Sequence, residues 1–133
     1  WRMEINKFVS QWRISNCYIS SSSSSLGVEN GASFYDSNTW HHMVMVYKVD
    51  DYVKVYINGV IDSASYKLSG SIGTLSNSHP LEIGGATILL ENTVVPLYNE
   101  FPGSIASVKF YNKYLTDSEV NQDYSSSKGR FGL

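Results

Sequence analysis

The feature that most constrains this chain is residues 40–59, where two strand-like segments are joined by an acidic turn. Met43 to Tyr47 are almost all apolar, which suits a short strand covered on both faces better than a helix of so few residues. Tyr52 to Ile57 then alternate, as in a strand with two different faces. One face carries Val53, Val55 and Ile57, and the other carries Tyr52, Lys54 and Tyr56. Asn58 and Gly59 tolerate positive φ and predict a tight turn, so the stretch predicts antiparallel sheet.

Size and composition indicate one globular domain. The 133 residues, 42% hydrophobic and 17% charged, are enough for a buried core. A formal charge of -2 and scattered Lys and Arg residues give no basic stripe, so we expect no nucleic-acid partner. No apolar run approaches the roughly 20 residues that span a bilayer, so we expect no membrane insertion. The single Cys17 excludes an internal disulfide, and the start at Trp1 suggests a piece of a longer polypeptide.

Short alternating runs separated by Gly, Asn, Ser and Pro continue the all-β pattern. Residues 1–6 and 12–18 alternate as half-buried strands, and a serine run over residues 20–25 predicts a surface loop. Residues 81–83 and 105–111 are further strand candidates beside glycines.

One helix is predicted near the C-terminus. Thr116 and Glu119 form a capping box, which places a short helix over about Asp117 to Tyr124. We therefore predict an all-β fold, a two-sheet antiparallel β-sandwich with one short C-terminal helix. The domain spans residues 1–124 and a tail spans residues 125–133. The predicted core residues are Trp40, Val44, Val46, Val55, Ile57, Ile83, Ile105, Val108 and Phe110.

Five motifs in a fixed order resemble a known superfamily. They are Trp40-His41-His42-Met43-Val44, Val55-Tyr56-Ile57-Asn58-Gly59, Pro80-Leu81-Glu82-Ile83-Gly84-Gly85, Phe101-Pro102-Gly103-Ser104-Ile105, and Phe110-Tyr111-Asn112 with Leu115 and Glu119-Val120. This order is similar to that of the laminin-G-like, concanavalin A-like lectin and glucanase superfamily. The resemblance implies a jelly-roll sandwich with residues 40–59 as a central hairpin. It also implies that Trp1 ends an early strand, so that the N-terminal strand is incomplete in this chain.

The superfamily includes glycoside hydrolases, lectins, adhesion modules and virion proteins, so the site must decide the function. The resemblance implies that retaining glycoside hydrolases of this superfamily need clustered carboxylates, with two carboxyl groups roughly 5 Å apart. The glutamates here are isolated: Glu4, Glu29, Glu82, Glu91, Glu100 and Glu119. We therefore predict that the chain is not an enzyme, with a degenerate glycoside hydrolase as an alternative.

Metal binding is not expected from the sequence. His41 and His42 are neighbours that would point to opposite sides of a strand, so we expect one ring packed inside rather than a shared ion. Calcium is the alternative, because predicted loops carry oxygen ligands. The calcium candidates are Asp50, Asp51, Asn99 and Glu100, with Glu91 and Asn92 in the same kind of loop. We favour solvated turn residues and no cofactor.

Aromatic residues suggest a ligand surface. The chain holds ten Tyr and three Trp, whose flat apolar faces and polar edges suit both sugar stacking and protein interfaces. Most belong to the core, and the candidates for an exposed glycan-binding platform are Tyr47, Tyr52, Tyr56 and Tyr66.

Two segments are predicted to meet other protein subunits. Residues 88–98 form two apolar arms around a turn, and either fold back on their own sandwich or bind a partner. Residues 125–133 look like an arm rather than a strand. The predicted interface residues are Ile88, Leu89, Leu90, Val94, Val95, Leu97, Tyr98, Arg130 and Phe131.

The last six residues, Lys-Gly-Arg-Phe-Gly-Leu, are similar to endings of structural proteins of tailed phages and large viruses. Together these features predict a non-catalytic binding or structural module of an extracellular or virion surface assembly, glycan-binding or adhesive. A free-standing lectin-like carbohydrate-binding domain is the alternative.

Overall fold

The structure is a computed structural model. It describes the backbone of residues 2–8, 11–20, 25–29, 38–48, 51–67, 81–90, 93–97 and 101–133, and the side chains of residues 38–48, 51–62, 81–85 and 101–133. The chain divides into two units. The first comprises Trp1–Leu75 with Tyr111–Leu133, and the second comprises Ser76–Phe110.

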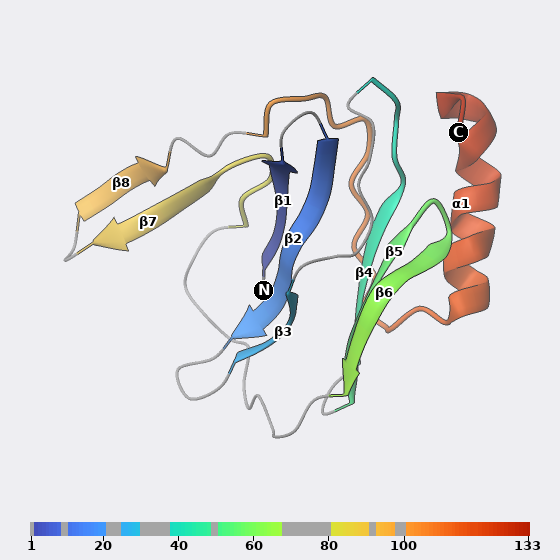
Figure 1. Cartoon of the computed structure of the whole chain (residues 1–133), viewed down its shortest axis with the longest axis horizontal. Coiled ribbons are helices and arrows are strands. Elements are labelled where there is room, and N and C mark those ends of the chain that lie inside the picture. The colour runs from blue at the N-terminus through green and yellow to red at the C-terminus, as the bar shows by residue number, and fades with distance from the viewer. Residues whose placement is uncertain are drawn as a thin grey trace. The chain divides into compact units, whose positions relative to one another are not determined.

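The described strands form antiparallel sheets in each unit (Figure 1). The first unit holds one sheet of β1 (Arg2–Phe8), β2 (Gln11–Ser20) and β3 (Ser25–Glu29), a second of β4 (Met43–Lys48), β5 (Tyr52–Ile57) and β6 (Val60–Lys67), and the helix α1 (Asp117–Phe131). The second unit holds the hairpin of β7 (Ala86–Leu90) and β8 (Thr93–Leu97). The strand predicted over residues 1–6 is confirmed as β1 from Arg2 onward, with Trp1 outside the described residues, and the strand over residues 12–18 is confirmed as β2. β3 was not predicted and begins at the last serine of the serine run.

The central hairpin predicted from residues 40–59 is confirmed. β4 pairs antiparallel with β5, with Val44 opposite Tyr56 and Val46 opposite Lys54. Asn58 (φ 51°) and Gly59 (φ 78°) make the turn into β6 in the left-handed region, which glycine adopts because it lacks a Cβ and asparagine tolerates through its short polar side chain. The predicted alternation of β5 therefore gives the sheet two distinct faces.

The start of α1 is also confirmed. Thr116 is the N-cap, and its hydroxyl accepts the Glu119 N–H at 3.3 Å while the Glu119 carboxylate accepts the Thr116 N–H at 2.9 Å. This reciprocal capping box satisfies donors that a helix start leaves unpaired.

The predicted end of the helix, at about Tyr124, is wrong, and so is the separate tail over residues 125–133. α1 continues to Phe131 and ends at Gly132 in the left-handed conformation (φ 69°). The hydroxyls of Ser126 and Ser127 each donate to the Asp123 carbonyl at 2.9 Å, so the serines that suggested a linker are accommodated within the helix. Lys128 and Arg130 in the last turn also stabilise this C-terminus, because their positive charges interact favourably with the helix dipole.

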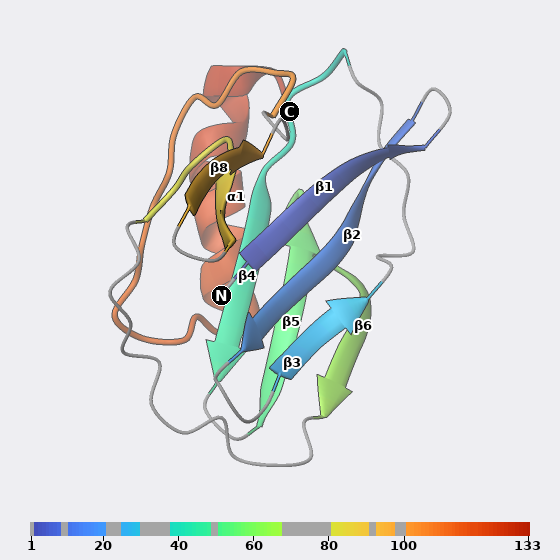
Figure 2. The same ribbon diagram turned by 90° about the vertical axis from the view of Figure 1, so that its left-hand side faces the viewer.

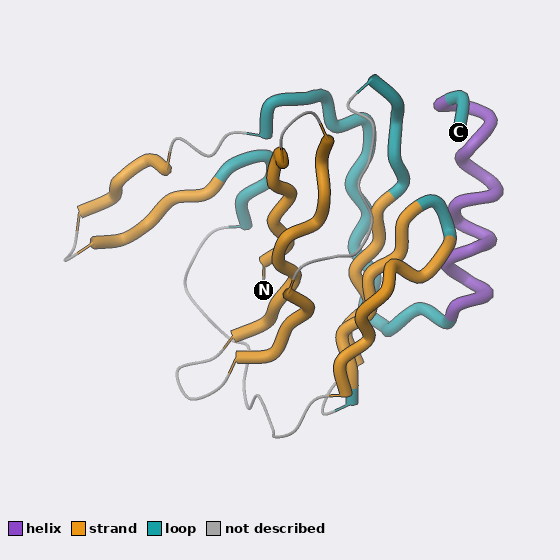
Figure 3. The backbone as a smooth tube through the Cα atoms, in the orientation of Figure 1, coloured by secondary structure: helices purple, strands orange, loops and turns teal. Residues whose placement is uncertain are grey.

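The core of the first unit lies where α1 packs against the β4–β6 sheet. Figures 1 and 2 show α1 running alongside this sheet from two directions, and Figure 3 shows the loop that leads into its N-terminus. Val120 is completely buried and packs with Val46, Tyr56 and Leu115. Helix and sheet therefore share one apolar layer.

The predicted core is confirmed in part. Val46, Val55 and Ile57 are buried, and Val44 is half-buried against the same cluster. Trp40 is 42% exposed, although its ring contacts Phe131 at a centroid distance of 5.8 Å.

Four predicted core residues are exposed: Ile83, Ile105, Val108 and Phe110. The structure describes residues 81–83 and 105–111 as loops, so the strands predicted there are wrong. Among the described residues these segments pair with no strand, so the cover expected from strand neighbours is not provided there. A backbone hydrogen bond joins two loops of this unit, in which the Gly84 carbonyl accepts the Phe101 N–H at 2.7 Å.

We predict that Ile57→Ala lowers the free energy of unfolding by about 2–5 kcal/mol, because Ile57 is only 6% exposed and truncation leaves a cavity. Ile61→Ala is the matched control at a position 42% exposed, where the change is expected to be about 1 kcal/mol or less. Denaturant unfolding followed by circular dichroism measures both. Equal effects would contradict the placement of Ile57 in the core.

Candidate functional site

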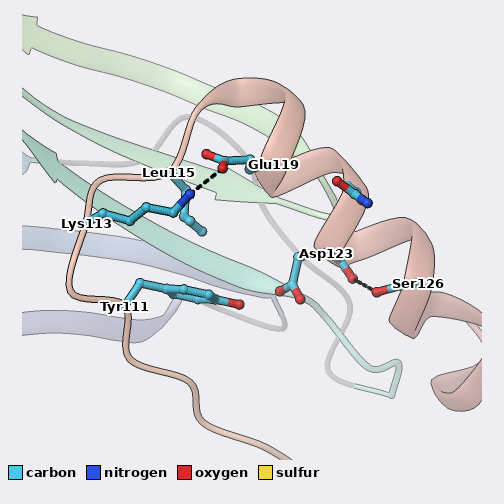
Figure 4. A pocket seen from close by; sticks show the side chains of 7 residues that line it. Tyr111, Lys113, Leu115, Glu119, Asp123 and Ser126 are labelled. Atoms are coloured by element: carbon cyan, nitrogen blue, oxygen red, sulfur yellow. Dashed lines mark hydrogen bonds and ion pairs between the residues drawn. The ribbon is translucent and has the colours of Figure 1, made fainter.

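A pocket of about 320 Å³ lies between α1 and the segment that precedes it (Figure 4). The preceding segment contributes Tyr111, Lys113 and Leu115, and the helix contributes Glu119, Gln122, Asp123 and Ser126. All seven residues belong to the first unit.

The segment before α1 presents every second residue to the pocket. Tyr111, Lys113 and Leu115 line it, and Leu115 continues inward to the buried cluster. Tyr114 lies apart from the pocket, with the Lys48 ammonium 5.4 Å from its ring centre. Leu115 therefore fixes the segment to the core and holds its neighbours at the rim.

The helix presents one polar face to the same pocket. Glu119, Gln122, Asp123 and Ser126 are spaced three, four and seven residues from the first, which places them on one side of an α-helix. Val120 points away from them into the sheet, where it is completely buried. Packing of Val120 therefore sets which side of α1 faces the pocket.

Glu119 is held ionised by three donors. Its carboxylate pairs with the Lys113 ammonium and accepts hydrogen bonds from the Thr116 N–H and the Thr116 hydroxyl at 2.9 and 3.0 Å. The Lys113 hydrogen bond, followed by those of Thr116, lowers the pKa of Glu119 to about 2. This carboxylate is a fixed anionic acceptor.

Asp123 is anchored from the sheet side by histidine. The His42 Nε2 lies 3.0 Å from the Asp123 Oδ2, and the His42 ring also packs against Tyr124 at a centroid distance of 5.8 Å. His42 itself is positioned by the turn after β5, since its N–H donates to the Asn58 Oδ1 at 3.0 Å and its carbonyl accepts the Asn58 N–H at 2.8 Å. The pair links the pocket directly to the β4–β6 sheet.

The pocket combines groups that recognise polyhydroxylated molecules. Tyr111 is 47% exposed, and its ring offers an apolar face with a polar edge. Around it lie two carboxylates, an amide, a hydroxyl and an ammonium group. Carboxylates accept and amides both donate and accept, so this arrangement can satisfy several hydroxyl groups at once.

Three of the four tyrosines predicted as candidates for an exposed platform have described side chains, and these three do not share one face of the sheet. Tyr52 and Tyr56 lie on the α1 face of β5, whereas Tyr47 is opposite Val53 on the other face of the sheet. Tyr66 pairs with Val53 through β6, and its side chain is outside the described residues.

Tyr56 is buried, and its hydroxyl donates to the Asp117 Oδ1 at 2.6 Å. Burial and this hydrogen bond raise the pKa of Tyr56. Tyr52 is half-buried, with the Lys48 and Lys54 ammonium groups 5.7 and 4.8 Å from its ring centre. Tyr56 is therefore a structural residue here, and ligand binding by Tyr47, Tyr52 or Tyr66 stays a prediction.

The predicted subunit contacts fall into two groups. The first group lies on β7 and β8, which form the expected hairpin with Leu90 opposite Thr93. The structure does not describe the side chains of this group, which are those of Ile88, Leu89, Leu90, Val94, Val95 and Leu97, and all of Tyr98 lies outside the described residues. Arg130 and Phe131 form the last turn of α1, and Phe131 contacts Trp40 of the same chain. The expectation that they belong to a separate arm is wrong, because the helix continues through them.

The metal candidates are described only in part. Asp51 donates its N–H to the Lys48 carbonyl at 3.1 Å and pairs its carboxylate with the Lys48 ammonium at 2.7 Å, as expected for a turn residue. Asp50, Asn99 and Glu100 lie outside the described residues. Where side chains are described, no group of three His, Cys, Asp or Glu residues is placed to hold a metal ion.

The two histidines also differ in their surroundings. His41 Nε2 lies 3.0 Å from the Thr39 hydroxyl near the surface, and His42 packs between the sheet and α1. The prediction that both histidines are strand residues is wrong, because β4 begins at Met43. No described helix is long and apolar enough to cross a membrane.

Comparison with known families assigns the fold. The antiparallel sheets and the capped C-terminal helix define an all-β protein of the kind that the superfamily contains. The family model of the concanavalin A-like lectin/glucanases superfamily matches residues 5–121, and the chain belongs to this superfamily. Membership implies a β-sandwich. The match extends well before Trp40, where the sequence motifs begin. No curated protein and no solved structure matches the chain significantly.

Sequence reasoning missed the pocket for two reasons. It ended the helix at about Tyr124, which removed Ser126 from the polar face, and it assigned residues 105–111 to a strand. The spacing of Glu119, Asp123 and Ser126, four and then three residues apart, was a visible signal of a common helix face.

We predict that Glu119→Gln destabilises the fold in a pH-dependent manner. The folded-state pKa of about 2 lies below the ordinary value of 4.5, so ionised Glu119 stabilises the fold above about pH 4.5 and loses this effect as the pH falls through about 2. The variant should be less stable than the native chain at pH 7, and the difference should shrink toward pH 2. Urea unfolding at each pH measures this.

Lys113→Met is the control, because it removes the first donor to Glu119 and should move the pH dependence toward higher pH. A stability difference between the native chain and Glu119→Gln that stays constant from pH 7 to about 2 would show that Glu119 is not held ionised by its partners.

Proposed function

We propose that this chain is a non-catalytic glycan-binding module that acts within a larger surface assembly. The pocket beside Tyr111 is the observation that carries the proposal, since an exposed aromatic face is surrounded there by fixed acceptors and donors. Membership in a superfamily of lectins and glucanases supports a carbohydrate ligand. An extracellular or virion surface location is part of the same proposal, as is closure of the sheets into a jelly-roll sandwich.

A binding role is favoured over hydrolysis by the ionisation of Glu119. A retaining or inverting glycosidase needs one carboxylic acid with a raised pKa to protonate the leaving oxygen. The pKa of Glu119 shifts the other way, to about 2, because Lys113 and Thr116 stabilise its charge. Glu119 is therefore unsuited to the role of acid. Release of reducing sugars from β-glucans above that of the Glu119→Gln variant would support the alternative of a degenerate hydrolase.

We predict that Tyr111→Ala weakens binding to the glycans selected on a printed array by about tenfold or more, because it removes the aromatic face of the pocket. Tyr114→Ala is the matched control. Tyr114 is 49% exposed, close to the 47% of Tyr111, but its ring lies beside the Lys48 ammonium and does not line the pocket. Tyr114→Ala should leave binding within about twofold of the native level.

Either of two results would count against the proposal. The native chain could show no selective glycan, which would favour a purely structural module. Alternatively, both tyrosine variants could lose binding equally, which would place the glycan elsewhere on the chain.

The hairpin of β7 and β8 is the proposed contact with other subunits. Its two strands pair only with each other among the described residues, and its sequence is rich in branched apolar residues. Contact with another subunit would bury this apolar area at about 25 cal/mol per Å² before the costs of association.

We predict that replacing Leu89, Leu90 and Leu97 with Ser dissociates the assembly and leaves the fold intact. Light scattering reports the mass of the particle, and circular dichroism reports the fold. Unfolding of the substituted chain would instead show that the hairpin belongs to the core of its own chain.

A further inference from the structure

The polar groups that line the pocket differ in whether the chain itself already uses them. The Lys113 ammonium pairs with the Glu119 carboxylate (Figure 4). The Asp123 carboxylate lies 3.0 Å from the His42 Nε2, and the Asp123 carbonyl accepts the Ser126 hydroxyl at 2.9 Å. These four lining residues therefore use part of their hydrogen-bonding capacity to hold the pocket in shape.

Glu119 shows how little capacity such a group keeps. Its Oε2 accepts the Thr116 N–H and the Thr116 hydroxyl at 2.9 and 3.0 Å, and its Oε1 accepts the Lys113 ammonium. A carboxylate has about four acceptor positions, so about one is left for a ligand. A ligand that displaced one of these donors would gain one hydrogen bond and break another.

Two other polar side chains of the lining, those of Gln122 and Tyr111, have no hydrogen-bond partner among the residues that the structure describes. Both residues are exposed, so a ligand reaches them directly. The amide of the preceding residue is different, because the Asn121 Oδ1 accepts the Ser125 hydroxyl at 3.4 Å and Asn121 does not line the pocket. Gln122 therefore offers the pocket an amide with both its carbonyl oxygen and its NH₂ group available.

We propose that Gln122 determines which glycan the pocket selects, by binding two neighbouring hydroxyl groups of one sugar ring, a vicinal diol. This inference rests on the glycan-binding function proposed above. The amide oxygen accepts from one hydroxyl while the NH₂ group donates to the next. Tyr111 lines the pocket from the segment before α1 and Gln122 lines it from the helix, so the sugar ring packs on the aromatic face while its diol meets the amide. The volume of about 320 Å³ is at the small end of the roughly 300–1,000 Å³ of ligand sites, which brings both walls within reach of one ligand.

The expected selectivity follows from the number of hydrogen bonds. One net hydrogen bond changes a dissociation constant by about two- to tenfold. Removal of either hydroxyl of the diol should weaken binding by about this factor. Removal of a hydroxyl elsewhere on the ring should have a smaller effect, because no second free amide lines the pocket.

The test is an NMR titration of the isotope-labelled chain with the methyl glycosides of glucose, galactose and mannose, and with monodeoxy forms that lack each ring hydroxyl in turn. We expect the side-chain amide signals of Gln122 to shift, and those of Asn121 to stay in place. Removal of either of two neighbouring hydroxyls should weaken binding about two- to tenfold in the native chain.

Gln122→Met is the decisive variant, because it keeps the length of the side chain and removes the amide. It should bind the intact glycoside about tenfold more weakly and should no longer respond to removal of the same two hydroxyls. Asn121→Leu is the matched control for loss of an exposed amide on α1, and it should bind within about twofold of the native level. Circular dichroism checks that both variants fold.

The outcomes separate this inference from glycan binding in general. Monodeoxy glycosides that are weakened equally in the native chain and in Gln122→Met would overturn it and leave glycan binding intact. Native-like binding by Gln122→Met, with binding lost in Tyr111→Ala, would do the same. Absence of binding by every methyl glycoside would also overturn it, because the diol belongs to a single ring. Glycan binding itself fails only if the printed array selects no glycan.

Discussion

The packing of α1 against the β4–β6 sheet is the interaction on which the rest of the first unit depends. Val120 inserts into an apolar layer with Val46, Tyr56 and Leu115, and each such side chain stabilises the fold by about 1.5–3 kcal/mol when fully buried. The helix can approach the sheet closely because Gly59 lacks a side chain. A Cβ there would lie 2.8 Å from the Tyr124 ring.

Polar contacts then fix the direction and register of the helix. At its N-terminus, Asp117 accepts hydrogen bonds from the Tyr56 hydroxyl and the Lys54 ammonium, which lower the pKa of its carboxyl. Farther along, Asp123 meets His42, and the last turn places Phe131 on Trp40. These contacts are made at successive positions along α1, so the pocket residues of the helix have a defined position relative to Tyr111. A pocket built on a helix held in this way is preorganised for a ligand.

The sequence predicted the parts of this arrangement that depend on local pattern. Alternation in Tyr52 to Ile57 defined the two faces of β5, and Thr116 with Glu119 defined the helix start, because both signals lie within a few residues. The end of the helix was missed because Ser125 to Ser127 favour loops in isolation, whereas here they bond within the helix and Phe131 is held by Trp40.

Whether each tyrosine is buried or exposed could not be predicted for a related reason, since it depends on segments far away in the sequence. Tyr56 is removed from any ligand surface by α1, which begins 61 residues later in the chain. Local periodicity shows that Tyr52 and Tyr56 share a face, but it does not say that a helix covers that face. Ile105 and Phe110 show the converse case: an apolar pattern predicted burial, whereas both residues are exposed and the structure describes their segment as a loop.

Native-state hydrogen exchange tests the central claim, that α1 is docked along its length as part of the core. The account predicts that amides of Asn121 to Tyr124 exchange only through the same global unfolding as those of Val53 to Ile57 in β5. Amides of α1 that exchange with little protection while those of β5 remain strongly protected would contradict it. They would show that the helix is a loosely attached tail and that the pocket is not preformed.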